Sequence, residues 1–153
     1  MADPFTIRIF VPDGDPEGVR LIDRLNWTGL GIVFPRAKWQ EVRLRPEVQR
    51  TGVYILVGYG GQDDELPTLY IGQADEARER IETHYTGNKS KDFWDWGIVF
   101  VSNSGGLNRA HVTWIEHALV KRAKEAKRCY LDNGNSPKNR RSARRKRPIP
   151  APS

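Results

Sequence analysis

The chain has 153 residues, a formal net charge of +6 and one cysteine, Cys129. That length suits one compact domain with at most a small appendage. A lone cysteine excludes an intramolecular disulfide and a cysteine-based zinc site, and it fits a reducing interior. No apolar run approaches the length of a membrane span, and the first residues lack a basic-then-apolar leader pattern. We therefore expect a cytoplasmic protein without a membrane partner, associated with the nucleoid if its host is bacterial.

The positive charge is concentrated towards the C-terminal end. Residues 121–147 hold twelve Lys and Arg against two acids, a net of +10, whereas the first 120 residues hold thirteen basic and seventeen acidic groups, a net of −4. This asymmetry predicts a polyanionic partner, with nucleic acid ahead of an anionic membrane surface. A basic end that only aids solubility, or that serves targeting or protein contact, is the alternative.

The section 1–50 matches no catalytic motif, and we expect it to form a β/α accessory segment packed on the main body. Asp15 and Pro16 form a helix start, and Val19, Ile22 and Leu25 recur at helical spacing. Breakers and apolar spacing predict four elements there: a strand at 7–11, a helix at 16–25, a strand at 32–34 and helical turns at 36–43.

The central section, 51–135, carries the most informative pattern. Two short apolar strands, at 53–57 and 68–71, flank a polar loop and are expected to pair antiparallel. A helix follows, with Asp75 as a candidate cap and with Arg80 and His84 four residues apart on one side. A third strand at 98–101 and a long helix from about 108 to 127 complete the order strand–strand–helix–strand–helix.

Glu116 interrupts the apolar stripe of the long helix, which otherwise runs through Val112, Leu119 and Ala123. A carboxylate on an apolar face is costly unless it is paired or binds a cation. The alternative is a rim position at which the carboxylate reaches water.

Two tripeptides and three further side chains resemble the GIY-YIG nuclease family. Gly52-Val53-Tyr54 and Tyr70-Ile71-Gly72 stand in the family's order. Arg80 lies ten residues beyond Tyr70, His84 fourteen beyond, and Glu116 follows the third strand. The similarity covers roughly residues 51–135. It implies an α+β fold, a small three-stranded antiparallel sheet flanked by helices.

The resemblance also implies an activity, the hydrolysis of nucleic-acid phosphodiesters by an endonuclease, with DNA as the expected substrate. By matching position, Tyr54 serves or assists the general base, and Tyr70 orients the attacking water or a phosphate oxygen. Arg80 holds the phosphate, and His84 supports the site or shares in proton transfer. Glu116 ligates one Mg²⁺ or Mn²⁺ ion, and no small-molecule cofactor is implied.

This chemistry is physically reasonable, because a cation and a guanidinium offset the charge that builds on the phosphate. A tyrosine can take a proton at neutral pH only if positive charge lowers its pKa. Gly52 and Gly72 belong to the motif backbone. The family also keeps an asparagine after the glutamate helix, for which both Asn133 and Asn135 are candidates.

Residues 136–153 are expected to be an irregular, basic, proline-containing tail. Its candidate nucleic-acid-binding residues are Arg140, Arg141, Arg144, Arg145, Lys146 and Arg147. A non-catalytic module that binds nucleic acid through this fold and tail is the competing hypothesis. The sequence leaves open DNA against RNA, strandedness, sequence specificity and oligomeric state.

Overall fold

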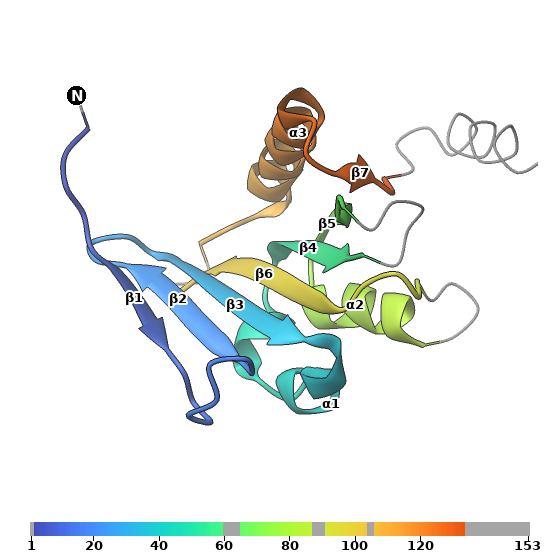
Figure 1. Ribbon diagram of the computed structural model, residues 1–153. Coiled ribbons are helices and arrows are strands. Elements are labelled where there is room, and N and C mark those ends of the chain that lie inside the picture. The colour runs from blue at the N-terminus through green and yellow to red at the C-terminus, as the bar shows by residue number, and fades with distance from the viewer. Residues whose placement is uncertain (1, 60–64, 87–90, 104–105, 134–153) are drawn as a thin grey trace, which may run out of the picture.

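The computed structural model describes residues 2–59, 65–86, 91–103 and 106–133, and it has an α+β fold built on one sheet (Figure 1). The strand order is β1-β2-β3-β6-β4-β5-β7. All neighbouring strands pair antiparallel except β5 and β7, which are parallel. The strands are β1 Ile7–Phe10, β2 Arg20–Arg24, β3 Gly29–Pro35, β4 Gly52–Gly58, β5 Thr68–Ala74, β6 Trp96–Ser102 and β7 Tyr130–Leu131.

Helices cover both faces of the sheet (Figure 1). α3 (Arg109–Ala126) lies on one face, over β4 and β5. α2 (Ala77–Tyr85) and the short α1 (Trp39–Val42) lie on the other face. Two 3₁₀ turns, η1 Arg36–Lys38 and η2 Pro46–Gln49, flank α1.

The three strands expected from the central section form the middle of this sheet. β4 pairs with β5 on one side and with β6 on the other. The expected three-stranded sheet is nevertheless too small, because the described strands number seven. β3 pairs with β6 along its whole length, from Gly29 opposite Ser102 to Pro35 opposite Trp96. The strands of residues 1–50 therefore continue the central sheet.

The helix expected at 16–25 is wrong, since Arg20–Arg24 is strand β2. The Asp15 carboxylate accepts from the Glu17 backbone N–H, and the Gly18 N–H donates to the Asp15 carbonyl, so the cap signal marks a turn. β2 then pairs with β1 and β3. Sheet pairing on both sides outweighs a helical spacing of only three apolar residues.

The two faces of the sheet have separate cores, which follow from strand alternation. Tyr54 and Leu56 face α1 and α2, where they pack with Trp39, Trp94 and Ile81. The opposite side chains of β4 and β5 pack against α3. That second cluster contains Val53, Ile71, Val112 and Val120.

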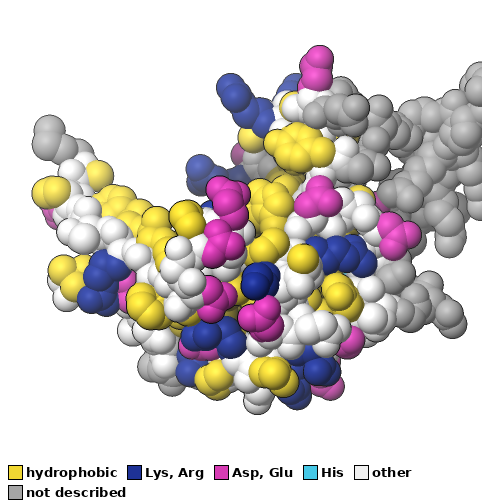
Figure 2. Space-filling view, turned by 60° about the horizontal axis from the view of Figure 1, so that its bottom comes forward, with side chains coloured by type: hydrophobic (Ala, Val, Ile, Leu, Met, Phe, Trp, Pro, Cys, Tyr) yellow, Lys and Arg dark blue, Asp and Glu magenta, His cyan; other side chains and the backbone are white. Residues whose placement is uncertain are grey.

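The N-terminal strands expose apolar side chains, seen on the left of Figure 2. Phe5, Ile7, Ile9 and Phe10 are each more than half exposed. Within the described part of the chain, no helix is long and apolar enough to cross a membrane.

Candidate active site

Tyr54 and Gly72 define the geometry of the site. They lie opposite each other on β4 and β5, and the Tyr54 ring passes directly over the glycine. A Cβ added at Gly72 would lie 2.5 Å from the Tyr54 Cζ and hydroxyl oxygen. Only a residue without a side chain lets the buried ring take this path. Gly52 has a similar role against β6, because a Cβ there would lie 2.5 Å from the Phe100 carbonyl oxygen.

His84 meets Tyr54 from α2. The Tyr54 hydroxyl lies 2.9 Å from the His84 Nε2 in a buried hydrogen bond. Tyr70, two residues before Gly72 and on the same face of β5, packs its ring against the His84 ring at 4.8 Å between centroids. The two tyrosine rings are 6.0 Å apart. The structure therefore brings three of the predicted site residues into one aromatic cluster.

Arg80 joins this cluster one helical turn before His84. The side chains of Tyr54 and Tyr70 interact with its guanidinium and together raise the pKa of Arg80. Among the residues that the structure describes, Arg80 has no carboxylate partner within ion-pair distance. An exposed guanidinium of this kind can receive an anion from solution.

The electrostatics of the cluster keep Tyr54 and His84 neutral near pH 7. Burial raises the pKa of Tyr54 above its ordinary value of 10.0, and Arg80 offsets only part of the increase. Burial, with the positive charges of Lys91 and Arg80, lowers the pKa of His84 to about 4. The neutral Tyr54 hydroxyl keeps its proton, and we assign that proton to the bond with Nε2. The His84 Nδ1 is buried without a hydrogen-bond partner.

Lys91 and Asp132 support this cluster, and the sequence pattern did not single out either residue. Lys91 Nζ is 2.9 Å from an Asp132 carboxylate oxygen and 4.6 Å from the centre of the Tyr70 ring. The Lys91 backbone N–H donates to the His84 carbonyl oxygen at 2.9 Å. Lys91 and Asp132 are 41 residues apart, so no local spacing could have linked them.

A cleft of about 410 Å³ opens beside Arg80, between α2 and the start of α3. The expected cap role of Asp75 is wrong: Glu76 occupies the N-cap position without a side-chain cap bond. Asp75 instead forms an ion pair with Arg109 across the cleft. The cleft is lined by Gln73, Ala74, Asp75, Glu76, Glu79, Arg80, Arg109 and Thr113.

Glu116 reaches the same region through Gln73. The Gln73 Nε2 donates to Glu116 Oε1 at 3.0 Å, and the Gln73 Oε1 accepts from the Thr113 hydroxyl at 3.1 Å. Glu116 is half-buried at the rim of the α3 core, so it is both paired and close to solvent. Its second carboxylate oxygen has no recorded donor in the described residues. Gln73 was missed by the sequence reasoning, although it directly follows the second tripeptide.

The cluster around Tyr54 and the Glu116–Gln73 pair lie on opposite faces of the sheet. Tyr54 and Tyr70 face α2, whereas Gln73 points towards α3 and Glu116. Near Gln73 the outer edge of β5 has no partner among the described strands, since β7 pairs only with Thr68 and Leu69. Glu116 makes no recorded contact with the tyrosine cluster itself. Arg80 and Gln73 nevertheless line one cleft, which places Glu116 one hydrogen bond away from it.

Asn133 holds the middle of β5 at Ile71. Its Oδ1 accepts from the Ile71 N–H at 2.9 Å, and its Nδ2 donates to the Ile71 carbonyl oxygen at 2.6 Å. The side chain thus continues the pairing that β7 begins. The competing candidate, Asn135, lies outside the described residues, as do the basic tail and its candidate nucleic-acid-binding residues.

Glu116 is the residue that the sequence resemblance assigns to a divalent cation. Mg²⁺ is commonly held by one or two carboxylates completed by water and phosphate oxygens. Glu116 offers one carboxylate oxygen without a protein donor, beside the amide of Gln73. In the part of the chain that the structure describes, no group of three or more His, Cys, Asp and Glu is arranged around one metal position.

Comparisons with protein-family models, with curated proteins and with solved structures found no match for this chain.

Proposed function

We propose that this protein is a divalent-metal-dependent endonuclease that hydrolyses phosphodiester bonds of nucleic acid, with DNA as the expected substrate. One observation carries the proposal. Tyr54, Tyr70 and His84 form one buried cluster, and Arg80 extends from it into a cleft that also reaches Glu116 through Gln73. The five residues implied by the sequence resemblance thus lie on or beside β4 and β5, four on one face of the sheet and Glu116 on the other.

Arg80 is assigned to the scissile phosphate. It is exposed, lacks a carboxylate partner in the described structure and is oriented by its contact with Tyr54. A guanidinium can bond two phosphate oxygens at once, and it gains strength as negative charge builds on them. Glu116 would hold the divalent cation, which supplies charge neutralisation at the phosphate when bound.

Tyr54 and His84 are assigned to the attacking water as a proton relay. The raised pKa of Tyr54 argues against a free tyrosinate. The Tyr54 side chain is fully buried in this structure, so its oxygen would have to become accessible before it could take a proton from water while its own proton passes to the His84 Nε2, 2.9 Å away. Besides burial and Lys91, the charge of Arg80 lowers the pKa of His84. A bound phosphodiester would neutralise that charge, so the pKa of His84 would rise and His84 would accept a proton more readily. Tyr70 orients the water or a phosphate oxygen.

Nicking of supercoiled plasmid and cleavage of linear and single-stranded DNA and RNA, each with Mg²⁺ or Mn²⁺, test the proposal. Glu116→Gln keeps the shape and the partner Gln73 but removes the charge, so cleavage should fall by at least about 100-fold. Arg80→Lys keeps the charge but loses the bidentate guanidinium. Cleavage should therefore fall less in Arg80→Lys than in Arg80→Ala. Glu17→Gln, which changes an exposed acid outside the cleft, is the matched control and should remain active.

A preparation that leaves every substrate intact with either metal would overturn the enzyme hypothesis. Binding without cleavage would then favour the non-catalytic nucleic-acid-binding module. Cleavage that survives both Glu116→Gln and Arg80→Ala would instead show that the activity belongs to other residues.

A further inference from the structure

The outer face of α3 carries an exposed aromatic and basic stripe. Val112, Ile115 and Leu119 turn to the sheet. Helical spacing of three and four residues then places a second set of side chains on the opposite face. This outer stripe consists of Trp114, His117, Lys121 and Lys124, all of them exposed.

Trp114 is the unusual member of the outer stripe. It is 71% exposed, whereas Trp39 and Trp94 are fully buried. Among the described residues it has no recorded ring partner, cation–π contact or hydrogen bond. Tryptophan contributes a large apolar surface, and leaving it in water forgoes that contribution. An exposed, unpaired indole is therefore available to a ligand.

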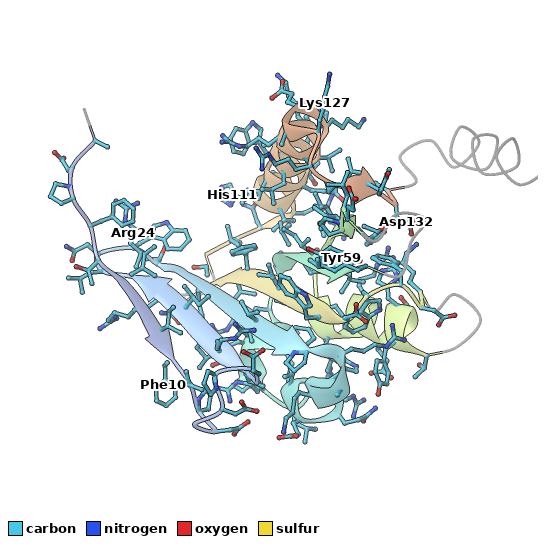
Figure 3. The ribbon with its side chains drawn as sticks, in the orientation of Figure 1. Phe10, Arg24, Tyr59, His111, Lys127 and Asp132 are labelled. Carbon is cyan, nitrogen blue, oxygen red and sulfur yellow. The ribbon has the colours of Figure 1, made fainter. Side chains whose placement is uncertain are left out.

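The stripe carries two exposed lysines, Lys121 and Lys124. Lys121 and Lys124 make no ion pair in the part of the chain that the structure describes. The helix dipole favours positive charge in the last turn, which accounts for Lys124. Lys121 lies before that turn. Lys127, labelled in Figure 3, follows at the end of the helix and extends the positive charge.

The stripe begins beside the cleft. Arg109 and Thr113, from the first turns of α3, line the cleft. Trp114 directly follows Thr113 and is the first side chain of the outer stripe. A nucleic-acid strand that leaves the cleft along α3 would therefore meet the Trp114 indole first and the lysines afterwards.

We propose that the outer stripe binds a single-stranded segment of the substrate nucleic acid, with Trp114 stacked on an unpaired base and Lys121 and Lys124 against phosphates. From Trp114 to Lys124 the helix rises about 15 Å. At a rise of 3.4 Å per nucleotide, this length matches roughly four nucleotides of stacked strand. The inference rests on the proposed function, because it takes the bound strand to be the one that enters the cleft.

Single strands fit the indole better than duplex. The faces of paired bases are covered by their neighbours, whereas an unpaired base can stack on an aromatic side chain whatever its sequence. The lysines supply charge without reading bases, so the stripe is expected to bind many sequences. An exposed acid, Glu125, lies four residues after Lys121 on the same side of α3, so it offsets part of the positive charge of the stripe.

Binding of fluorescein-labelled DNA, followed by anisotropy, tests the proposal. The full chain carrying Glu116→Gln would be titrated with a single strand of about twelve nucleotides and with the blunt duplex of the same sequence. Trp114→Ala should weaken single-strand binding about 5- to 150-fold, the range for loss of one stacked base, and should leave duplex binding unchanged. Trp27→Ala, at another exposed tryptophan, is the matched control and should bind normally.

The lysines are tested by the salt dependence of single-strand binding. Lys121→Gln with Lys124→Gln should make the slope of log affinity against log salt shallower by about 1.4, because two phosphate contacts are lost. The charge-preserving pair Lys121→Arg with Lys124→Arg should keep the slope of the parent.

The proposal fails if the parent does not bind single strands, or if Trp114→Ala binds them normally. It also fails if Trp27→Ala weakens single-strand binding as much as Trp114→Ala does. The same holds if Trp114→Ala lowers the affinity for single strands and for duplex equally. These outcomes are separate from the plasmid assay. A cleaving enzyme that is indifferent to Trp114 would refute only the stripe, and stripe-dependent binding without cleavage would refute only the nuclease.

Discussion

Tyr54 lies over Gly72, and this contact between neighbouring strands directs the tyrosine hydroxyl towards α2. A side chain at position 72 would occupy the place of the phenol ring, with its Cβ 2.5 Å from the Tyr54 hydroxyl oxygen. The hydroxyl would then lose its position 2.9 Å from His84 Nε2. The glycine of the second tripeptide thus permits the geometry of the tyrosine in the first.

Gly72→Ala is therefore expected to destabilise the protein by about 1–3 kcal/mol, the usual range for overpacking in a core. It should also reduce cleavage, because Tyr54 must move. Gly31→Ala is the matched control on another strand, since its added Cβ would meet Phe100 at an ordinary 3.5 Å. Urea unfolding of both variants provides the measurement. Equal stability of Gly72→Ala and wild type would refute the close contact.

His84 predicts a pH dependence of stability. Its pKa falls from 6.5 to about 4 in the folded protein. Between these values the unfolded chain binds a proton that the folded protein does not, so stability is lost as pH falls through this window. The slope is at most about 1.4 kcal/mol per pH unit.

The His84 contribution is measured as a difference between variants, because carboxylates also titrate in this range. Urea unfolding from pH 4 to pH 7.5 should show a shallower loss in His84→Gln than in wild type. His117→Gln, at an exposed histidine, should follow the wild-type curve. Identical curves for wild type and His84→Gln would show that the buried imidazole titrates normally.

Lys91 is expected to stabilise the cluster through Asp132. The two side chains are 18% and 5% exposed, so Lys91→Gln removes a cation that faces a buried carboxylate. We expect a loss of about 3 kcal/mol, the lower end for breaking a buried pair. The pKa of His84 should also rise, because the charge of Lys91 lowers it.

Arg78→Gln provides the comparison for Lys91, because its ion pair with Glu76 is about one-third exposed. Such a pair contributes less than about 1 kcal/mol. Chemical denaturation measures the stabilities, and NMR titration of the imidazole measures the pKa. Similar losses in the two variants would mean that Asp132 does not depend on Lys91.

Asn133→Ala should loosen the middle of β5 at Ile71. The substitution removes both hydrogen bonds to the Ile71 backbone and leaves those groups to water or to no partner. A cost of about 1–3 kcal/mol is expected. Hydrogen exchange at the Ile71 amide should accelerate, whereas Asn103→Ala, at an exposed asparagine after β6, should leave it unchanged. Unchanged protection in Asn133→Ala would contradict the pairing.

Local patterns predicted the central strands and helices correctly. The alternation around Tyr54 identified β4, and Asn108 does cap α3, where it forms a capping box with His111. The four-residue spacing of Arg80 and His84 placed them on neighbouring positions of α2. These features depend on side chains close in sequence, so periodicity and capping chemistry are sufficient to find them.

Only the tertiary structure decided which of these elements meet. Residues 20–24 pair as a strand because β1 and β3 supply hydrogen-bonding partners on both sides. Asp75 turns to Arg109, and Glu116 is held by Gln73 from the opposite face of the sheet. The sequence by itself determined the chemical groups and the local helices and strands that carry them. Pairing between distant segments determined the size of the sheet and the side of β5 from which each group approaches, because such contacts carry no local periodicity.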